Sequence, residues 1–225
     1  MSRAHPTRGV VFDLDGTLLD SLPLVLRAFQ HALEPFGGKP TMATFALLGG
    51  PPEKVFPSLI KDPRDVPAAM KRLHEFHEQH PELMEPFAGA LTLLDELHGR
   101  KVKLAIWTGR DRASAQHLLA HHGMAKYFSA VVCGDDLPSH KPDPAGLRAI
   151  LETLALAPAH TVFIGDADVD VLGGTDLGID TLLITHGRVL EAEIERRAFG
   201  IVVAPAEAYA WARRCVASPK ASGES

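Results

Sequence analysis

Continuous apolar runs, several of them rich in β-branched residues, recur along the chain. Runs that do not alternate with polar residues are typical of strands buried on both faces of a sheet. We therefore expect strands at residues 9–13, 102–107, 130–133, 161–165 and 181–184. Helical patterns lie between the last four runs. One begins at Asp111, and another begins at Asp143-Pro144, with Asp143 as the expected N-cap. This alternation predicts a parallel α/β sheet with helices on both faces.

A long segment interrupts this rhythm after the first strand. About 90 residues separate Asp13 from the second strand, many more than one crossover helix needs. The intervening patterns are helical, at residues 22–36, 53–60 and 66–80, with Gly- and Pro-rich breaks between them. We therefore predict a self-contained helical insert within one sheet domain.

The expected organisation is a Rossmann-like core with one inserted helical domain. The core comprises residues 1–19 and 87–216, and the insert comprises residues 20–86. The polar residues 217–225 are expected to form a flexible tail.

Composition narrows the classes of partner. The 225 residues carry a formal net charge of −5 and 6% aromatic residues, which argues against a broad basic face or stacking platforms for nucleic acid. No apolar run approaches the roughly 18 residues of a membrane span, and the first residues lack a signal-peptide core. The two cysteines, Cys133 and Cys215, form no CxxC pair, which is typical of unpaired thiols in a reducing compartment. We expect a cytoplasmic monomer or weak homodimer that binds a small molecule, with neither nucleic acid nor membrane as a partner.

The first strand ends in two closely spaced carboxylates, Asp13 and Asp15, followed by Gly16. Gly16 permits a sharp turn and a close approach of ligand to the backbone. Two carboxylates this close repel each other unless a cation joins them or one is protonated. The pair therefore suits a divalent cation or a general acid, although a solvated acidic turn is the simpler alternative.

Polar groups also follow the later strands. Thr108-Gly109 offers a hydroxyl and an amide as an oxyanion cradle, Lys141 offers a fixed cation, and Asp166 and Asp170 share one face of a nascent helix. Taken singly, these residues also suit a helix cap, an exposed lysine and a solvated acidic loop. Open α/β sheets bind ligands at the carboxyl ends of their strands, so together they predict one site. Asp13 and Asp166 would suffice for Mg²⁺.

These residues, in this order and spacing, resemble the four motifs of the haloacid dehalogenase (HAD) superfamily. The motifs are Asp13-Leu14-Asp15-Gly16-Thr17, Thr108, Lys141 and Gly165-Asp166-x-x-x-Asp170. The resemblance covers about residues 10–183. The helical insert resembles the C1-type cap of the phosphoglycolate phosphatase-like branch, so the insert is expected to act as a cap.

The resemblance implies a role for each motif residue. Asp13 is the nucleophile that forms an aspartyl-phosphate, and Asp15 is the general acid and then the base. Thr108 and Lys141 bind the phosphoryl oxygens, together with the amide of Gly109.

The same resemblance implies a Mg²⁺ site. Its ligands are the Asp13 carboxylate, the Asp15 backbone carbonyl and Asp166, and Asp170 supports them from nearby.

The expected function is a Mg²⁺-dependent phosphatase acting on a small organic phosphate monoester, such as phosphoglycolate, a sugar phosphate or a nucleotide. Dehalogenases of the superfamily lack an acid at the position of Asp15, so its presence favours phosphate esters over halides. The alternatives are a phosphomutase of the β-phosphoglucomutase kind and a phospho-accepting module like a response-regulator receiver. A receiver has no use for Asp15 or for a long cap.

The chain departs from the branch at two positions. Gly109-Arg110 stands where many relatives have Asn after the motif threonine, and His140 replaces a small residue before Lys141. We expect Arg110 and the insert residue Lys54 to contact an anionic leaving group, and Gly16 to lie against the substrate.

Overall fold

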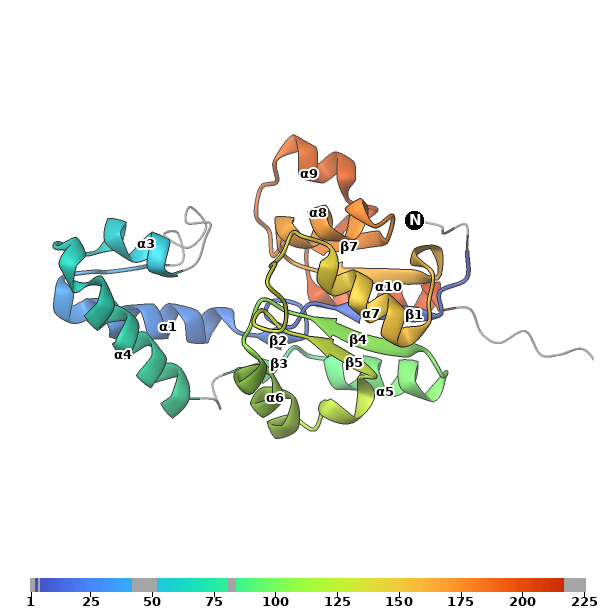
Figure 1. Cartoon of the computed structure of the whole chain (residues 1–225), viewed down its shortest axis with the longest axis horizontal. Coiled ribbons are helices and arrows are strands. Elements are labelled where there is room, and N and C mark those ends of the chain that lie inside the picture. Colours follow the sequence, from blue (N-terminus) through green and yellow to red (C-terminus); the bar gives the residue numbers. More distant parts are fainter. Residues whose placement is uncertain (1–2, 4, 42–51, 81–83, 217–225) are drawn as a thin grey trace, which may run out of the picture. The chain divides into compact units, whose positions relative to one another are not determined.

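The computed structural model describes residues 3, 5–41, 52–80 and 84–216. Its largest element is a six-stranded sheet in the order β5-β4-β1-β6-β7-β8, in which each strand pairs in parallel with its neighbours (Figure 1). The strands are β1 Gly9–Phe12, β4 Lys103–Trp107, β5 Ala130–Val132, β6 Thr161–Gly165, β7 Asp180–Ile184 and β8 Gly200–Val202. The predicted Rossmann-like α/β fold is confirmed.

Burial explains why the continuous apolar runs became strands. Every residue of β1 and β6 is buried, and Val10 lies in register with Leu104 on one side and Val162 on the other. Strands covered on both faces gain no advantage from alternating polar residues. The apolar runs therefore mark the centre of the sheet.

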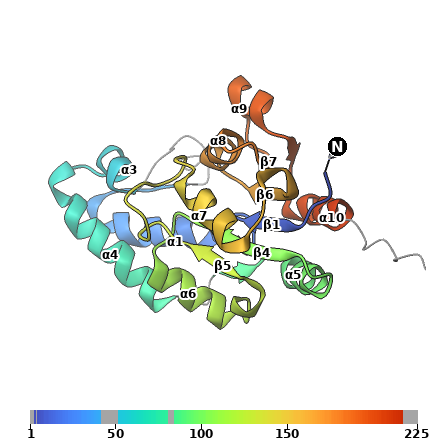
Figure 2. The ribbon, with the colours of Figure 1, turned by 45° about the vertical axis from the view of Figure 1, so that its right-hand side comes forward.

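Helices cover both faces of this sheet (Figure 2). They are α5 Ala90–Gly99, α6 Arg112–His121, α7 Ala145–Leu154, α8 Asp168–Asp176, α9 Ala192–Arg197 and α10 Pro205–Cys215. Helix α7 packs on the face that presents Val11, Ala105 and Phe163. Helices α5 and α10 contact each other and cover the opposite face. None of the helices in the described part of the chain is long and apolar enough to cross a membrane.

Two helix starts test the expected caps. The Asp111 carboxylate accepts the Ser114 N–H at 2.9 Å, so Asp111 caps α6 as predicted. The prediction for Asp143 was wrong by one residue, because Pro144 occupies the N-cap position of α7. Asp143 still accepts the Ala145 N–H at 2.9 Å and satisfies one free donor of the first turn.

The chain divides into two compact units, one of residues 1–19 and 86–225 and the other of residues 20–85. The second unit contains α1 Leu22–Leu33, η1 Glu34–Phe36, α3 Pro52–Leu59, η2 Pro63–Asp65 and α4 Val66–Gln79. It has its own apolar core, in which Phe29 meets Phe56 edge to face at 4.9 Å between ring centroids. The chain passes between the units at β2 Leu19–Asp20 and β3 Glu85–Pro86, which pair with each other.

Two elements differ from the expectation. The helix expected over residues 22–36 ends as α1 at Leu33 and continues as a 3₁₀ turn, because Pro35 has no N–H for the helical ladder. Strand β8 was not predicted. The predicted tail, residues 217–225, lies outside the described residues.

Candidate active site

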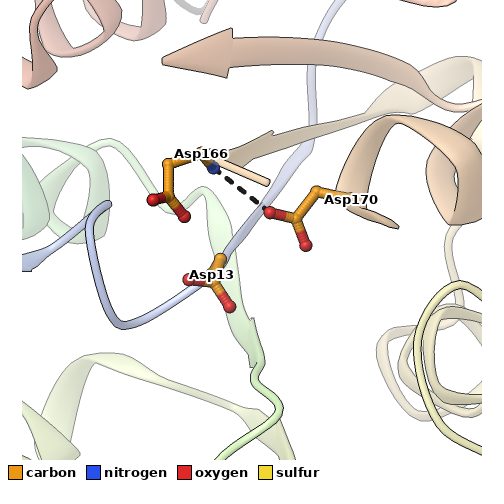
Figure 3. A group of neighbouring side chains, drawn as sticks. All are labelled: Asp13, Asp166 and Asp170. Carbon is orange, nitrogen blue, oxygen red and sulfur yellow. Dashed lines mark hydrogen bonds between the residues drawn. The ribbon is translucent and has the colours of Figure 1, made fainter. Parts of the chain in front are cut away.

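Asp13 follows β1 directly, and its carboxylate lies close to those of Asp166 and Asp170 (Figure 3). Its N–H donates to the Ile164 carbonyl at 2.8 Å, which continues the pairing of β1 with β6. Its Oδ1 accepts a hydrogen bond from Lys141 Nζ at 2.6 Å. The side chain is nearly buried, so the sheet fixes the carboxylate in place.

Lys141 joins two carboxylates that are far apart in sequence. Its Nζ donates to Asp13 Oδ1 and to Asp170 Oδ1, at 2.6 and 2.7 Å. The same nitrogen lies over the rings of Trp107 and Phe163, at 4.9 and 5.5 Å from their centroids. Burial disfavours the ammonium, but Asp13 and Asp170 outweigh it and raise the pKa of Lys141. Lys141 is therefore a permanent cation that lies over the rings of Trp107 and Phe163, which we call the aromatic floor.

Asp170 organises the turn between β6 and α8. Its Oδ2 accepts the N–H groups of Asp166 and Ala167 at 3.1 and 3.0 Å, and its Oδ1 accepts from Lys141. Asp166 precedes the first residue of α8, so the expectation that Asp166 and Asp170 share a helix face was wrong. The turn still brings both carboxylates toward Asp13 (Figure 3), whereas Asp168 pairs with Arg188 at 2.6 Å.

The three carboxylates of Asp13, Asp166 and Asp170 each offer an oxygen within 4.8 Å of the others. Burial raises the pKa of Asp13 to about 7, opposed by Lys141 and reinforced by Asp170. Burial also raises the pKa of Asp166 well above its ordinary value, with further contributions from Asp13 and Asp170. Such a cluster is stabilised when a cation neutralises it.

The donor set fits a hard divalent cation, because Mg²⁺ prefers oxygen ligands and uses few carboxylates. Both oxygens of Asp170 already accept hydrogen bonds from Lys141 and from the turn. Among the described residues, no side-chain donor bonds to the carboxylate of Asp166, and only Asp13 Oδ1 is held by Lys141. Asp13 and Asp166 therefore have oxygens to offer a metal ion, and Asp170 positions the turn.

Asp15 lies on the turn that follows Asp13, held by the N–H groups of Leu18 and Leu19 on the Leu14 carbonyl at 2.9 Å each. Arg110, in the loop that follows β4, donates two hydrogen bonds to the Asp15 carboxylate. Its Nε donates to Asp15 Oδ2 at 2.9 Å, and its terminal nitrogen donates to Oδ1 at 2.5 Å. The structure thus brings Arg110 to the expected acid–base residue.

At Gly16, the atoms that come close to the backbone belong to another residue of the protein. The φ of Gly16 is +75°, and a Cβ there would lie 2.2 Å from Asp166 Oδ2, so a larger residue would push the acidic cluster apart. The Gly16 carbonyl lies 2.7 Å from His186 Nε2, and the neighbouring Thr17 carbonyl accepts from the Tyr209 hydroxyl at 2.6 Å. The turn is therefore fixed from two other elements.

Thr108 and Gly109 directly follow β4. The Thr108 N–H donates to the Val132 carbonyl at 3.0 Å, and its buried Oγ1 accepts the Arg110 N–H at 3.2 Å. No described atom lies within 4 Å of the place where a Cβ on Gly109 would stand. This strand end offers a hydroxyl and open space beside it, as an oxyanion cradle requires.

The loop after β7 contributes two residues that the sequence reasoning missed. His186 reaches Gly16, as above, and its ring stacks on Phe87 at 5.7 Å between centroids. Arg188 donates to the Asp166 carbonyl at 3.0 Å. Their position in the sequence could have identified them as site residues, because they follow the end of β7 as the other site residues follow other strands.

Lys54 lies in α3, and its side chain is outside the described part of the structure. The structure therefore gives no account of the expected contact between Lys54 and a leaving group.

Comparison with known proteins gives the chain its family. The model of the haloacid dehalogenase-like hydrolases matches residues 10–184. The chain is 31% identical over 179 residues to pyrophosphatase PpaX of Halalkalibacterium halodurans, covering 79% of this chain and 83% of that protein. It is 33% identical over 190 residues to phosphoglycolate phosphatase of Cereibacter sphaeroides, covering 80% and 85%.

A solved structure agrees in fold. The crystal structure of a putative beta-phosphoglucomutase from Thermotoga maritima matches with a TM-score of 0.78 and 27% identity, covering 92% of this chain and 99% of that one. The motif order, the sheet and the family match together show that this chain belongs to the haloacid dehalogenase-like hydrolases.

Proposed function

We propose that the protein is a cytoplasmic, Mg²⁺-dependent phosphatase that hydrolyses a small organic phosphate monoester through an aspartyl-phosphate. The observation that carries this proposal is the buried Asp13, which accepts a hydrogen bond from Lys141 and lies within 4.8 Å of a carboxylate oxygen of Asp166. Relatives named as phosphoglycolate phosphatase and pyrophosphatase support phosphoryl chemistry. The free thiols of Cys133 and Cys215 suit a reducing compartment.

The reaction proceeds in two displacements. In the first, an oxygen of Asp13 forms a bond to phosphorus while the bond from phosphorus to the ester oxygen breaks, and Asp15 gives that oxygen a proton. In the second, water attacks the same phosphorus, Asp15 takes the proton of the water, and the bond to Asp13 breaks. The products are an alcohol or acid and inorganic phosphate.

The other residues position and neutralise the phosphoryl group. Thr108, the Gly109 amide and Lys141 bind its non-bridging oxygens, and Asp13 and Asp166 hold Mg²⁺ together with the Asp15 carbonyl. When bound, the ion offsets the repulsion between a carboxylate nucleophile and an anionic phosphate. Such positioning is the main task in phosphoryl transfer.

The insert, residues 20–86, acts in this proposal as a cap that excludes bulk water from the site and contributes Lys54. Its separate apolar core supports the idea of a unit that can move as a whole.

The direct test measures inorganic phosphate released from three esters (2-phosphoglycolate, a hexose phosphate and a nucleoside monophosphate) and from the anhydride pyrophosphate, with Mg²⁺ or with EDTA. We expect release with Mg²⁺ only, and at least a thousandfold loss in Asp13→Asn. The control is Asp176→Asn, which changes an exposed carboxylate paired with Arg197. Full activity of Asp13→Asn would refute the mechanism, and a hexose phosphate isomerised without release of phosphate would indicate a phosphomutase.

A further inference from the structure

Arg110 engages both oxygens of Asp15 in a planar, two-point contact. Its side chain is only 17% exposed, so the guanidinium is largely removed from water. Once a bound substrate displaces the remaining water, the guanidinium needs an anionic acceptor in place of any it loses, because a charged donor is costly to leave unsatisfied after desolvation.

The backbone of Arg110 is anchored to the same strand end as the phosphate-binding residues. Its N–H donates to Thr108 Oγ1 at 3.2 Å, and its carbonyl accepts the Gly134 N–H at 2.8 Å. A Cβ on Gly134 would lie 2.3 Å from the Gly109 carbonyl, so the two loops pack backbone to backbone. The guanidinium therefore projects from a fixed base beside the phosphoryl site.

This contact conflicts with the role proposed for Asp15. To pass a proton to the leaving oxygen, Asp15 must turn at least one carboxylate oxygen toward that atom. In the structure, Arg110 donates to both oxygens. When Asp15 turns to the substrate, at least one of these two hydrogen bonds from Arg110 must be given up.

A suitable substrate resolves the conflict by supplying the acceptor itself. In the proposed reaction the leaving oxygen must come next to Asp15, and Arg110 lies one hydrogen bond beyond Asp15, so the new acceptor must be close to the leaving oxygen. A carboxylate or a second phosphate fits the planar fork of arginine at two points, whereas an alcohol does not.

Building on the proposed function, we propose that Arg110 is a specificity-determining residue that selects phosphate esters with an anionic group adjacent to the leaving oxygen. Arg110 exchanges the Asp15 carboxylate for this substrate anion, and the exchange frees Asp15 for proton transfer. Esters of neutral alcohols offer Arg110 no anion to exchange for the Asp15 carboxylate and react slowly. If Arg110 instead bound the transferring phosphoryl group, its loss would slow all esters alike.

The test uses two esters that differ only in this anion, 2-phosphoglycolate and 2-hydroxyethyl phosphate. For the wild type, we expect kcat/KM to be at least about tenfold higher with 2-phosphoglycolate. Arg110→Gln should lower this ratio of kcat/KM values about tenfold or more. In this variant Asp15 is free of Arg110 with either ester, so that change affects both kcat/KM values equally and cancels in the ratio. Arg110→Lys should retain part of the ratio, since it keeps the charge without the fork.

Arg112→Gln is the matched control. Arg112 stands two residues further on and grips the Asp136 carboxylate through Nε at 2.6 Å, away from the acid cluster. Its replacement should leave the ratio between the two esters unchanged. An equal fall for both esters in Arg110→Gln, an unchanged ratio, or a wild type with no preference would overturn the proposal.

A binding measurement separates this proposal from the proposed function. In the Asp13→Asn background, 2-phosphoglycolate should raise the melting temperature more than 2-hydroxyethyl phosphate does, and Arg110→Gln should abolish the difference. If the wild type hydrolyses neither ester but this difference is found, the proposed function fails and the selection by Arg110 stands. If neither ester binds with preference, the selection is refuted as well.

Discussion

Two cation–carboxylate contacts lie in one site and differ in character. Lys141 meets Asp13 with side-chain exposures of 10% and 9%, and meets Asp170, whose exposure is 1%. Arg110 meets Asp15 with exposures of 17% and 32%. The first contact is buried over the rings of Trp107 and Phe163, and the second is partly exposed, mainly at Asp15. The contrast indicates that one contact is permanent while the other can exchange its partner.

The burial of each contact also sets what its loss should cost. A buried pair that loses one partner leaves an uncompensated charge in the protein interior, whereas in a partly exposed pair water takes over part of the lost interaction. Changes at Lys141 should therefore affect folding and catalysis together, and changes at Asp15 should affect catalysis alone.

The largest effect is expected for Lys141→Ala. The loss of the ammonium leaves Asp13 and Asp170 buried without their cation, so the free energy of unfolding should fall by about 3 kcal/mol. The loss of a phosphoryl ligand should lower kcat/KM at least about a hundredfold. Urea unfolding and phosphate release measure the two effects. The control is Lys126→Ala, an exposed lysine that also lies over an aromatic ring, that of Tyr127.

Asp15→Asn should separate catalysis from folding. The amide cannot transfer the proton, so kcat should fall about a hundredfold. The free energy of unfolding should change by less than about 1 kcal/mol, because the lost ion pair is partly exposed. A loss of stability as large as that of Lys141→Ala would contradict the contrast between the two contacts.

A pH series should show the cost of the buried carboxylates without metal. The pKa of Asp13 rises from 3.8 to about 7 on folding, so between these values the folded protein holds a proton that the unfolded chain has lost. The free energy of unfolding in EDTA should therefore fall as pH rises from about 4 to about 7. Asp166 shifts in the same direction and adds to this slope.

Urea unfolding at pH 5 and pH 8 measures this difference. Mg²⁺ should restore more stability at pH 8 than at pH 5, because the carboxylates that bind it are then ionised. Asp13→Asn should flatten the slope in EDTA. A stability that rises with pH over this range would show that the cluster is not buried as described.

The smallest effect is expected for Trp107→Phe. Phenylalanine keeps an aromatic face under Lys141 but offers the cation a weaker interaction, so kcat/KM should fall about two- to fivefold. Trp211→Phe, which changes the other tryptophan of the chain, is the control for the loss of a buried indole. Equal effects of the two substitutions on kcat/KM would argue against a role for the aromatic floor.

The sequence predicts the centre of this molecule better than its edges. Strands β1 and β6 were predictable because both are buried throughout. Strand β8 is three residues long and pairs only with β7, and its middle residue, Ile201, is partly exposed, so no continuous apolar run marks it.

The contacts of the candidate site also divide into those that the sequence predicts and those that it does not. Asp13, Lys141 and Asp170 could be expected to meet because each lies between the carboxyl end of a strand and the first turn of the next helix, at the same edge of the sheet. The contact between Arg110 and Asp15 joins residues 95 positions apart and depends on side-chain direction, which spacing does not encode. His186 and Arg188 required the strand-end argument to be extended to the loop after β7.

The position of Trp107 gives the enzyme an optical reporter. The chain has two tryptophans, and only the indole of Trp107 lies beneath the ammonium of Lys141, with Gly146 and Gly173 against its edges. Indole emission responds to a charge that moves near the ring. A phosphoryl group that binds Lys141 brings negative charge close to this ring and should therefore change the fluorescence of Trp107, with Trp211 in α10 as an internal reference. Occupancy of the site can then be followed without a label and without turnover.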